Sequence, residues 1–235
     1  MQLDILAIGA HPDDVELFAG GTLAKMSALG HATGIVDLTR GELGTRGTPA
    51  MRAREARAAA AILQVKVREN LRLTDGDITA TPAARLKLIR VLRKYRPHIV
   101  MTHYWDDPHP DHVHASHLVA EAVHHSGLAK INTGQERHRP SVILYFKLPF
   151  GMAPSFVVDV SDYIEQRNAA IAAHQSQLFD PNGKGLETIL SRPDFFTHIE
   201  NIHSFYGTMI GKRQGEAFHY RETLAVKDPL AHFCG

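Results

Sequence analysis

Two short polar motifs, about a hundred residues apart, hold the side chains best suited to chemistry in this sequence. The first, Ala-His-Pro-Asp-Asp-Val-Glu at residues 10–16, directly follows an apolar run, and the second is His-Pro-Asp-His at residues 109–112. Together they supply enough carboxylates and imidazoles to hold one Zn²⁺-like ion with an open position. An acid-base group would still remain beside that ion. The two motifs therefore predict metal-assisted hydrolysis.

Segments that favour strands and helices alternate along the chain. Apolar runs predict strands at 3–9, 31–38, 65–73, 98–102, 141–146 and 156–160. Periodic segments predict helices from Gly20 to Gly30 and at 50–64, 82–95, 110–125, 162–177 and 193–210, with a turn-rich loop at 180–185. This alternation favours a Rossmann-like α/β fold, a mostly parallel sheet flanked by helices on both faces. No repeat, low-complexity tract or long linker divides the chain, so we expect one domain over residues 1–235.

Both motifs follow predicted strands, and open α/β sheets bind ligands at the carboxyl ends of their strands. Asp13 and Asp14 could also cap the next helix, but a cap needs one carboxylate and no histidine. On a helical wheel His112 falls near Val119 and Val123 and should point inward, where it needs a metal ion or a buried hydrogen bond as partner.

Composition excludes several other classes of protein. The 235 residues carry a net charge of +1 and no basic stripe, which argues against a nucleic-acid partner. The single cysteine, Cys234, excludes a disulfide framework and a cysteine-type zinc knuckle. We expect a cytoplasmic protein without a membrane segment, because the chain has no signal peptide and no apolar run that would span a bilayer. Motifs of serine hydrolases, zincins and nucleotide-binding loops are also missing from the sequence.

The paired motifs resemble those of the LmbE-like, or PIG-L-type, metal-dependent N-deacetylases, and the resemblance covers nearly the whole chain. Four further strings, at residues 38–47, 154–159, 174–177 and 215–218, resemble the branch that acts on N-acetylglucosaminyl-malate in bacillithiol biosynthesis. The resemblance implies a Zn²⁺-dependent deacetylase of a small N-acetylglucosamine (GlcNAc) conjugate, working as a homo-oligomer, often a hexamer. Fe²⁺ would also suit imidazole and carboxylate ligands.

Other functions stay open from the sequence. A chitooligosaccharide or a GlcNAc-inositol could be the substrate instead. A phosphoester hydrolase on the same fold would need more bridging carboxylates than these motifs supply. A non-catalytic metal- or sugar-binding protein would not need a base beside a complete ligand set.

The resemblance also implies roles for individual residues at the metal centre. His11, Asp14 and His112 match the metal ligands. Asp13 matches the general base, and its place one residue from a ligand lets it accept a proton from the attacking water.

Further residues are assigned to the substrate. His109 matches a group that stabilises the oxyanion and protonates the leaving amine, and Asp111 matches the carboxylate that orients it. Arg52 matches an arginine that contacts the sugar, and Asp75 a carboxylate that binds its hydroxyls. An anionic aglycone would need a guanidinium, so Arg46 or Arg52 would pair with its carboxylates.

Overall fold

The computed structural model describes residues 1–182 and 186–230, and within them seven strands form one sheet in the order β3-β2-β1-β4-β5-β7-β6. The strands are β1 Ile5–Gly9, β2 Thr33–Thr39, β3 Val67–Leu73, β4 Ile99–His103, β5 Val142–Phe146, β6 Phe156–Asp159 and β7 Gly215–Tyr220. The helices are α1 Asp14–Ala28, α2 Pro49–Ile62, α3 Pro82–Tyr95, α4 Pro110–Ser126, α5 Ile164–Ala172 and α6 Phe195–Met209, with a short 3-10 turn, η1, at Ser161–Tyr163.

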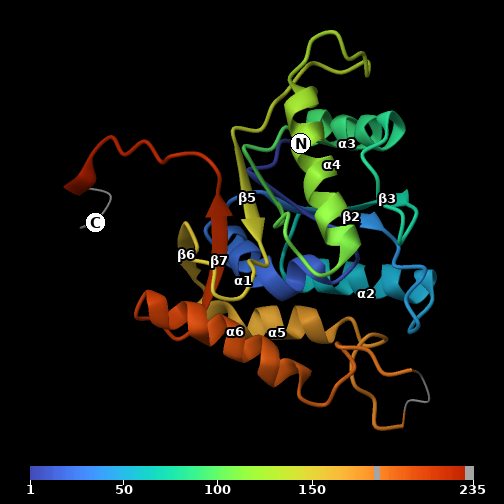
Figure 1. Cartoon of the computed structure of the whole chain (residues 1–235), viewed down its shortest axis with the longest axis vertical. Coiled ribbons are helices and arrows are strands. Elements are labelled where there is room, and N and C mark those ends of the chain that lie inside the picture. The colour runs from blue at the N-terminus through green and yellow to red at the C-terminus, as the bar shows by residue number, and fades with distance from the viewer. Residues whose placement is uncertain (183–185, 231–235) are drawn as a thin grey trace.

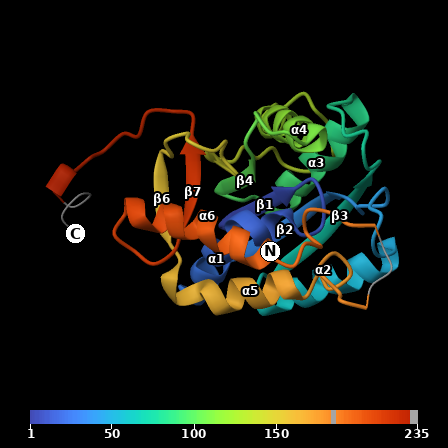
Figure 2. The same cartoon turned by 60° about the horizontal axis from the view of Figure 1, so that its bottom comes forward.

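Helices cover both faces of this sheet, as the sequence predicts (Figures 1 and 2). Figure 2 shows α3 and α4 on one side, with α1, α2 and α5 on the other. Alternate residues of β1 feed the two cores, because successive side chains of a strand point to opposite faces. Leu6 and Ile8 pack toward α3 and α4, whereas Ile5 and Ala7 pack toward α1 and α2.

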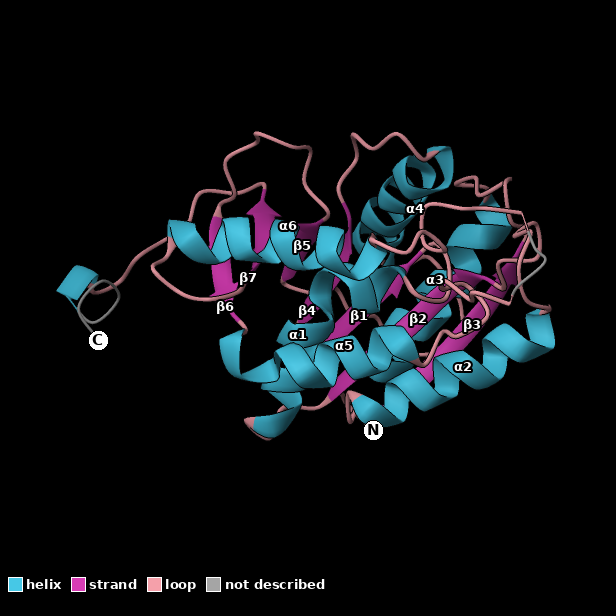
Figure 3. Ribbon diagram, turned by 90° about the horizontal axis from the view of Figure 1, so that it is seen from below, coloured by secondary structure: helices cyan, strands magenta, loops and turns pink. Residues whose placement is uncertain are grey.

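The five strands from β3 to β5 run parallel, and β7 is antiparallel to both of its neighbours. The strand β7 is absent from the sequence-based prediction, where residues 215–218 serve only as a family string. Helix α6 lies along the β7 and β6 end of the sheet (Figure 3). Strand β7 therefore extends the sheet beyond the parallel strands that carry the two motifs.

The first helix begins at Asp14 and not at Gly20, so that prediction is wrong. Gly20 and Gly21, in the middle of α1, were mistaken for its start. In the structure these glycines leave space for another segment of the chain to pack against the helix. The carboxylate of Glu216 accepts hydrogen bonds from the backbone N–H of Gly21 at 2.8 Å and of Thr22 at 2.7 Å. A Cβ on Gly21 would lie 2.9 Å from Val160 Cβ, closer than side-chain packing allows. Glycine here lets the β6–β7 unit approach the helix.

Three smaller points complete the comparison. The helix predicted for residues 162–177 ends at Ala172. The loop expected at 180–185 lies partly, and Cys234 wholly, outside the described residues. Over residues 1–182 and 186–230, no helix is long and apolar enough to cross a membrane.

Candidate metal and acid-base site

The polar residues of both motifs meet at the carboxyl edge of the parallel strands. His11 and Asp14 lie just after β1, and His112 lies in the first turn of α4, which follows β4. Asp14 Oδ1 is 3.3 Å from His112 Nε2, and Asp14 Oδ2 is 3.5 Å from His11 Nδ1. The structure thus brings together the three residues predicted as metal ligands.

A further imidazole, His103 at the end of β4, joins this cluster. His103 Nε2 lies 3.1 Å from Asp14 Oδ2, and its side chain is fully buried. Burial lowers the pKa of His103 to about 4, against the opposing effect of Asp14, so the ring is neutral near pH 7. The predicted strand stopped at Thr102, one residue short. The sequence did hold a signal for His103: it is a histidine in the last position of the strand that leads to the second motif.

Two overlapping groups of donors could hold a divalent ion. One consists of Asp14, His103 and His112, and the other of His11, His109 and His112. Within each group the candidate ligand atoms lie within 4.8 Å of one another. Imidazole nitrogens with a carboxylate oxygen are a donor set that suits Zn²⁺ and Fe²⁺. Neither group is the predicted set of His11, Asp14 and His112, which stays a prediction, but the chemistry of both groups fits a divalent metal ion.

Two carboxylates flank His11 on the side away from Asp14. His11 Nε2 lies 3.0 Å from Asp75 Oδ1 and 3.2 Å from Asp111 Oδ2, a third candidate donor group. Burial lowers the pKa of His11, but the hydrogen bonds with Asp111, Asp14 and Asp75 outweigh it and raise the pKa to about 12. Such a concentration of negative charge around one imidazole attracts cations.

Asp13 occupies a strained turn between β1 and α1. Its φ is 139°, a backbone conformation that residues other than glycine rarely adopt. Its side chain does not cap α1, so the capping alternative is wrong for Asp13. Instead its Oδ2 accepts a hydrogen bond from Arg52 Nη2 at 3.1 Å. Burial raises the pKa of Asp13 to about 6, with Arg52 opposing the rise. A carboxylate with this pKa is suited to general-base catalysis near neutral pH.

Arg52 is itself buried, and its guanidinium is largely occupied by protein acceptors. It donates to the carbonyl oxygens of Gly41 at 3.1 Å and Pro12 at 2.9 Å in addition to Asp13. A Cβ on Gly41, whose φ is +63°, would lie 1.7 Å from Arg52 Nη1. The glycine-rich loop that contains Gly41 therefore packs directly against the Arg52 guanidinium. A contact between Arg52 and a sugar stays a prediction.

The other predicted substrate groups also make defined contacts. Arg46 donates to the carbonyl oxygens of Ser176 at 3.2 Å and Leu178 at 3.1 Å. Asp75 Oδ2 accepts the Leu43 N–H at 2.8 Å. These bonds tie the loop after β2 to the loops after β3 and α5.

His109 is the exposed histidine of the cluster, with its ring centroid 4.9 Å from that of His11 and 4.5 Å from that of His112. Its Nδ1 accepts the backbone N–H of Asp111 at 3.2 Å. The Asp111 carboxylate itself binds the Gly76 N–H at 2.8 Å and faces His11. Asp111 therefore contacts His109 through its backbone N–H, whereas its carboxylate contacts His11.

The Nδ1 side of His112, away from Asp14, contacts two residues that the sequence analysis did not single out. Its Nδ1 lies 3.1 Å from Asp107 Oδ1 and 2.9 Å from Lys147 Nζ. Lys147 Nζ also lies 2.8 Å from Asp107 Oδ2, and Lys147 has a φ of 57° at the end of β5. A carboxylate behind a histidine fixes ring orientation in many metal sites. Asp107 precedes His112 by five residues, so the first of these contacts could have been suspected.

Glu16, the last residue of the first motif, has a structural environment. It is fully buried, forms an ion pair with Arg68, and its Oε1 lies 2.8 Å from His174 Nε2. Arg68 also makes two hydrogen bonds of 2.9 Å to the carboxylate of Asp37. The motif therefore anchors α1 to β2, β3 and the segment that follows α5.

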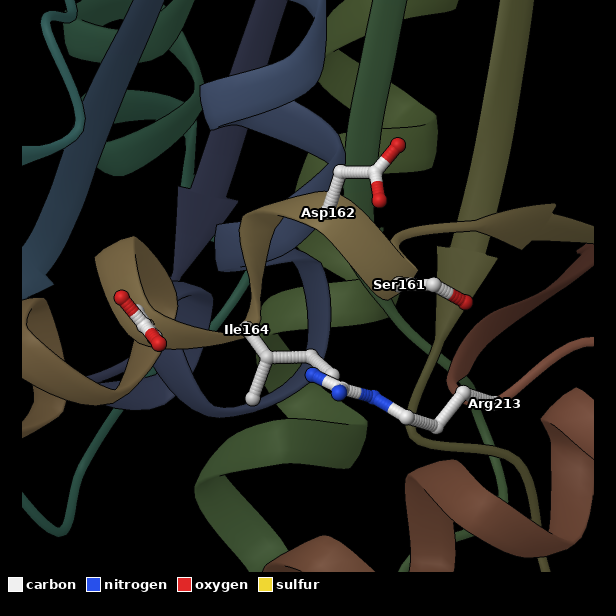
Figure 4. Close-up of a pocket in the computed structure, with 5 residues that line it drawn as sticks. Ser161, Asp162, Ile164 and Arg213 are labelled. Carbon is white, nitrogen blue, oxygen red and sulfur yellow. The ribbon is translucent and has the colours of Figure 1, made fainter.

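A pocket of about 440 Å³ lies elsewhere, beside η1 and the start of α5 (Figure 4). Ser161, Asp162, Ile164 and Arg213 line it together with Glu165. None of these five residues belongs to the donor groups, so the pocket is separate from the metal and acid-base site.

The fold and the site define an α/β protein with a His/Asp donor cluster and a buried carboxylate at the carboxyl edge of its sheet. The model of the family PIG-L, GlcNAc-PI de-N-acetylase, matches residues 6–123. This chain belongs to that family.

Individual relatives extend the match over the whole chain. Diacetylchitobiose deacetylase of Thermococcus kodakarensis is 30% identical, over 98% of this chain and 85% of the relative. A 1D-myo-inositol 2-acetamido-2-deoxy-alpha-D-glucopyranoside deacetylase of Catenulispora acidiphila is 24% identical, over 97% of this chain and 92% of the relative. Among solved structures, the conserved protein TT1542 from Thermus thermophilus has a TM-score of 0.87 and 37% identity, over 96% of this chain and 98% of that one.

Proposed function

We propose that this protein is a divalent-metal-dependent hydrolase that removes the N-acetyl group from a small GlcNAc conjugate. The observation that carries the proposal is the buried Asp13, with its pKa raised to about 6, beside the cluster of His11, Asp14, His103 and His112. A metal-storage or sugar-binding protein would need the ligands but not this base. Membership of the deacetylase family supports the same reaction.

His11, Asp14 and His112 are the proposed ligands of the ion, and Zn²⁺ is the ion we propose. A bound divalent ion supplies Lewis-acid activation of water and of the acetyl carbonyl group. Asp13 accepts the proton that the attacking water loses. Arg52 holds the Asp13 carboxylate in place through the 3.1 Å bond, so the base needs little reorientation before it acts.

His109 is proposed to act on the substrate side. Because its Nδ1 accepts the Asp111 N–H, the neutral ring carries its proton on Nε2. That proton can stabilise the oxygen of the tetrahedral intermediate and then pass to the leaving amine. The water oxygen bonds to the acetyl carbon, the C–N bond breaks, and acetate and the free amine leave.

Two candidate substrates differ in charge. The diacetylchitobiose deacetylase relative favours a neutral disaccharide. The family strings at 38–47, 154–159, 174–177 and 215–218 favour N-acetylglucosaminyl-malate in bacillithiol biosynthesis. A malate conjugate would need a cation for its carboxylates. Arg46 and Arg52 already donate hydrogen bonds to protein acceptors, so either arginine must break some of these bonds to bind the malate carboxylates. GlcNAc-inositol, the substrate type in the second relative's name, is a third candidate.

The test is release of free amine by the purified protein, with and without added Zn²⁺, from N-acetylglucosaminyl-malate, diacetylchitobiose and GlcNAc-inositol in parallel. Metal-dependent release from at least one conjugate is expected. If these arginines bind the malate carboxylates, Arg46→Ala and Arg52→Ala should raise KM for the malate conjugate more than for diacetylchitobiose. No release from any of the three, by protein that binds the metal, would refute the proposed function.

A homo-oligomer is proposed from the family resemblance alone. Several large apolar side chains are exposed, including Phe150 at 95% and Leu230 at 75% exposure. The segment after β7 leads away from the sheet (Figure 1). Analytical ultracentrifugation would decide between a monomer and a closed oligomer.

A further inference from the structure

His103 has no part in the proposed reaction, yet it is buried against two of the proposed ligands. We propose that His103 is a positioning residue that holds Asp14 and His112 in the geometry that binds the metal, and so raises metal affinity. The inference rests on the proposed metal dependence, but not on which amide is hydrolysed.

The first observation is the contact with Asp14. His103 Nε2 lies 3.1 Å from Asp14 Oδ2, and the other carboxylate oxygen, Oδ1, lies 3.3 Å from His112 Nε2. The His11 backbone N–H also donates to Asp14 Oδ2, at 2.7 Å. The His11 N–H and the His103 ring thus both contact Oδ2, which limits rotation of the carboxylate, and Oδ1 faces His112. His103 thereby decides which oxygen of Asp14 is presented to the ion.

The second observation is ring stacking. The rings of His103 and His112 are parallel within 8°, with centroids 4.1 Å apart. His103 also packs edge-on against Phe146, with ring centroids 4.8 Å apart. The His112 ring therefore stacks on a fully buried ring, and Asp107 and Lys147 both contact its Nδ1. This arrangement limits the rotation of His112 before any ion binds, which reduces the entropy lost on binding.

The third observation explains why His103 is better suited to holding a ligand than to being one. Its Nε2 is also the acceptor in the hydrogen bond from the Ala10 backbone N–H, at 3.1 Å. The single in-plane position of this nitrogen either accepts from Ala10 or carries a proton for Asp14, and an ion would have to displace whichever contact is made. Within the described residues its Nδ1 has no hydrogen-bond partner. A buried ring that leaves a nitrogen unpaired reduces stability, as expected where geometry is kept for function.

The experiment measures metal affinity and not turnover. Zn²⁺ dissociation constants are determined on metal-free protein by competition with a chromophoric chelator, for wild type, His103→Ala and His103→Gln. The visible absorption of bound Co²⁺ reports the ligand set. A glutamine amide can donate to Asp14 and accept from Ala10 at once, so it replaces both contacts of Nε2 without the ring.

His203→Ala is the matched control. His203 is also a buried histidine, with ring nitrogens 3.1 Å from the Gly215 carbonyl oxygen and 2.9 Å from that of Leu17, away from the donor cluster. Both alanine variants should lower the unfolding temperature of the metal-free protein. Only His103→Ala should weaken Zn²⁺ binding, by about 10- to 100-fold as for other residues that hold metal ligands.

Recovery of most of that affinity in His103→Gln, with an unchanged Co²⁺ spectrum, is the expected result. Equal Zn²⁺ affinity in His103→Ala and wild type would overturn the proposal. An altered Co²⁺ spectrum with no recovery in His103→Gln would also overturn it, because His103 would then be a ligand. Wild-type protein that binds Zn²⁺ tightly but releases no amine would refute the proposed function and leave this inference intact.

Discussion

The buried charges around Glu16 offer the sharpest test of how the first motif supports the fold. Arg68 pairs with Glu16, makes two 2.9 Å bonds to Asp37, and donates to the Ala56 carbonyl oxygen at 3.1 Å. The side chains of Glu16 and Asp37 are 0% and 3% exposed. Arg68→Met keeps most of the apolar stem but removes the cation that the two buried carboxylates share, although Glu16 keeps its contact with His174.

The expected loss of stability is large. Removing one partner of a buried ion pair usually costs about 3–5 kcal/mol, because the remaining charge stays desolvated. For a protein of this size, each kcal/mol lowers the unfolding temperature by about 2–4 °C. Arg68→Met should therefore unfold about 6–20 °C below wild type. Arg85→Met is the matched control, because Arg85 pairs with Glu121 at 2.9 Å on the surface. It should cost less than about 1 kcal/mol.

The pH dependence gives an independent check. Burial raises the pKa of Glu16, but Arg68 and His174 outweigh it and lower the pKa from 4.5 to about 2. The ionised Glu16 then stabilises the folded state by about 3 kcal/mol above pH 4.5, and this is lost as the pH falls toward 2. Asp37 acts in the opposite direction, because burial raises its pKa. His174 has a raised pKa, held up by Glu16 against burial, so its contribution is present below pH 6.5 and declines as the pH rises.

The assay is urea unfolding followed by circular dichroism at several pH values from 3 to 8, for wild type, Arg68→Met and Arg85→Met. Wild-type stability should fall toward acid, with a shallower fall in Arg68→Met, where Glu16 has lost its main cation. An Arg68→Met protein within about 1 kcal/mol of wild type at pH 7, the cost of a surface pair, would refute the reasoning. Such a result would mean that water or a rearranged side chain compensates the buried carboxylates.

Three further predictions concern the site itself. Asp13→Asn should lower amide hydrolysis by about 10²- to 10⁴-fold, the usual contribution of a general base, while metal content measured by elemental analysis stays at the wild-type level. Incubation with a chelator should abolish amine release, and added Zn²⁺ or Fe²⁺ should restore it; activity that survives complete metal removal would contradict the mechanism. Gly41→Ala should displace Arg52, since the new Cβ would lie 1.7 Å from Arg52 Nη1. It should reduce kcat more than Gly30→Ala, a glycine that also has positive φ but open space around it.

Much of the site's location could be predicted because its two motifs are local. Each motif follows a strand directly, and parallel strands bring their carboxyl ends to one edge of a sheet. The helical wheel of α4 correctly turned His112 inward. The alternation of strands and helices also correctly predicted a mostly parallel sheet.

The parts that escaped prediction depend on contacts between distant segments. Strand β7 takes its place because Glu216 binds the backbone of α1, nearly 200 residues earlier in the chain. Lys147 reaches Asp107 only because β4 and β5 are neighbours, and its left-handed φ has no local signature. Periodicity and spacing carry no information about such pairs.

The distribution of contacts within residues 11–16 shows why this motif is longer than a metal site needs. His11 and Asp14 face the donor cluster, whereas Asp13 turns to Arg52 of α2 and Glu16 to Arg68 of β3. Each motif carboxylate thus has a partner of its own, and two of these partners are buried arginines. If the arginines only neutralised charge, lysine would serve as well. Arg52 and Arg68 instead bind several acceptors each in fixed directions, which a single ammonium cannot reproduce. The strained turn at Asp13 is therefore held by directional bonds from both sides, which places the base and the ligand on consecutive residues with little freedom to move apart.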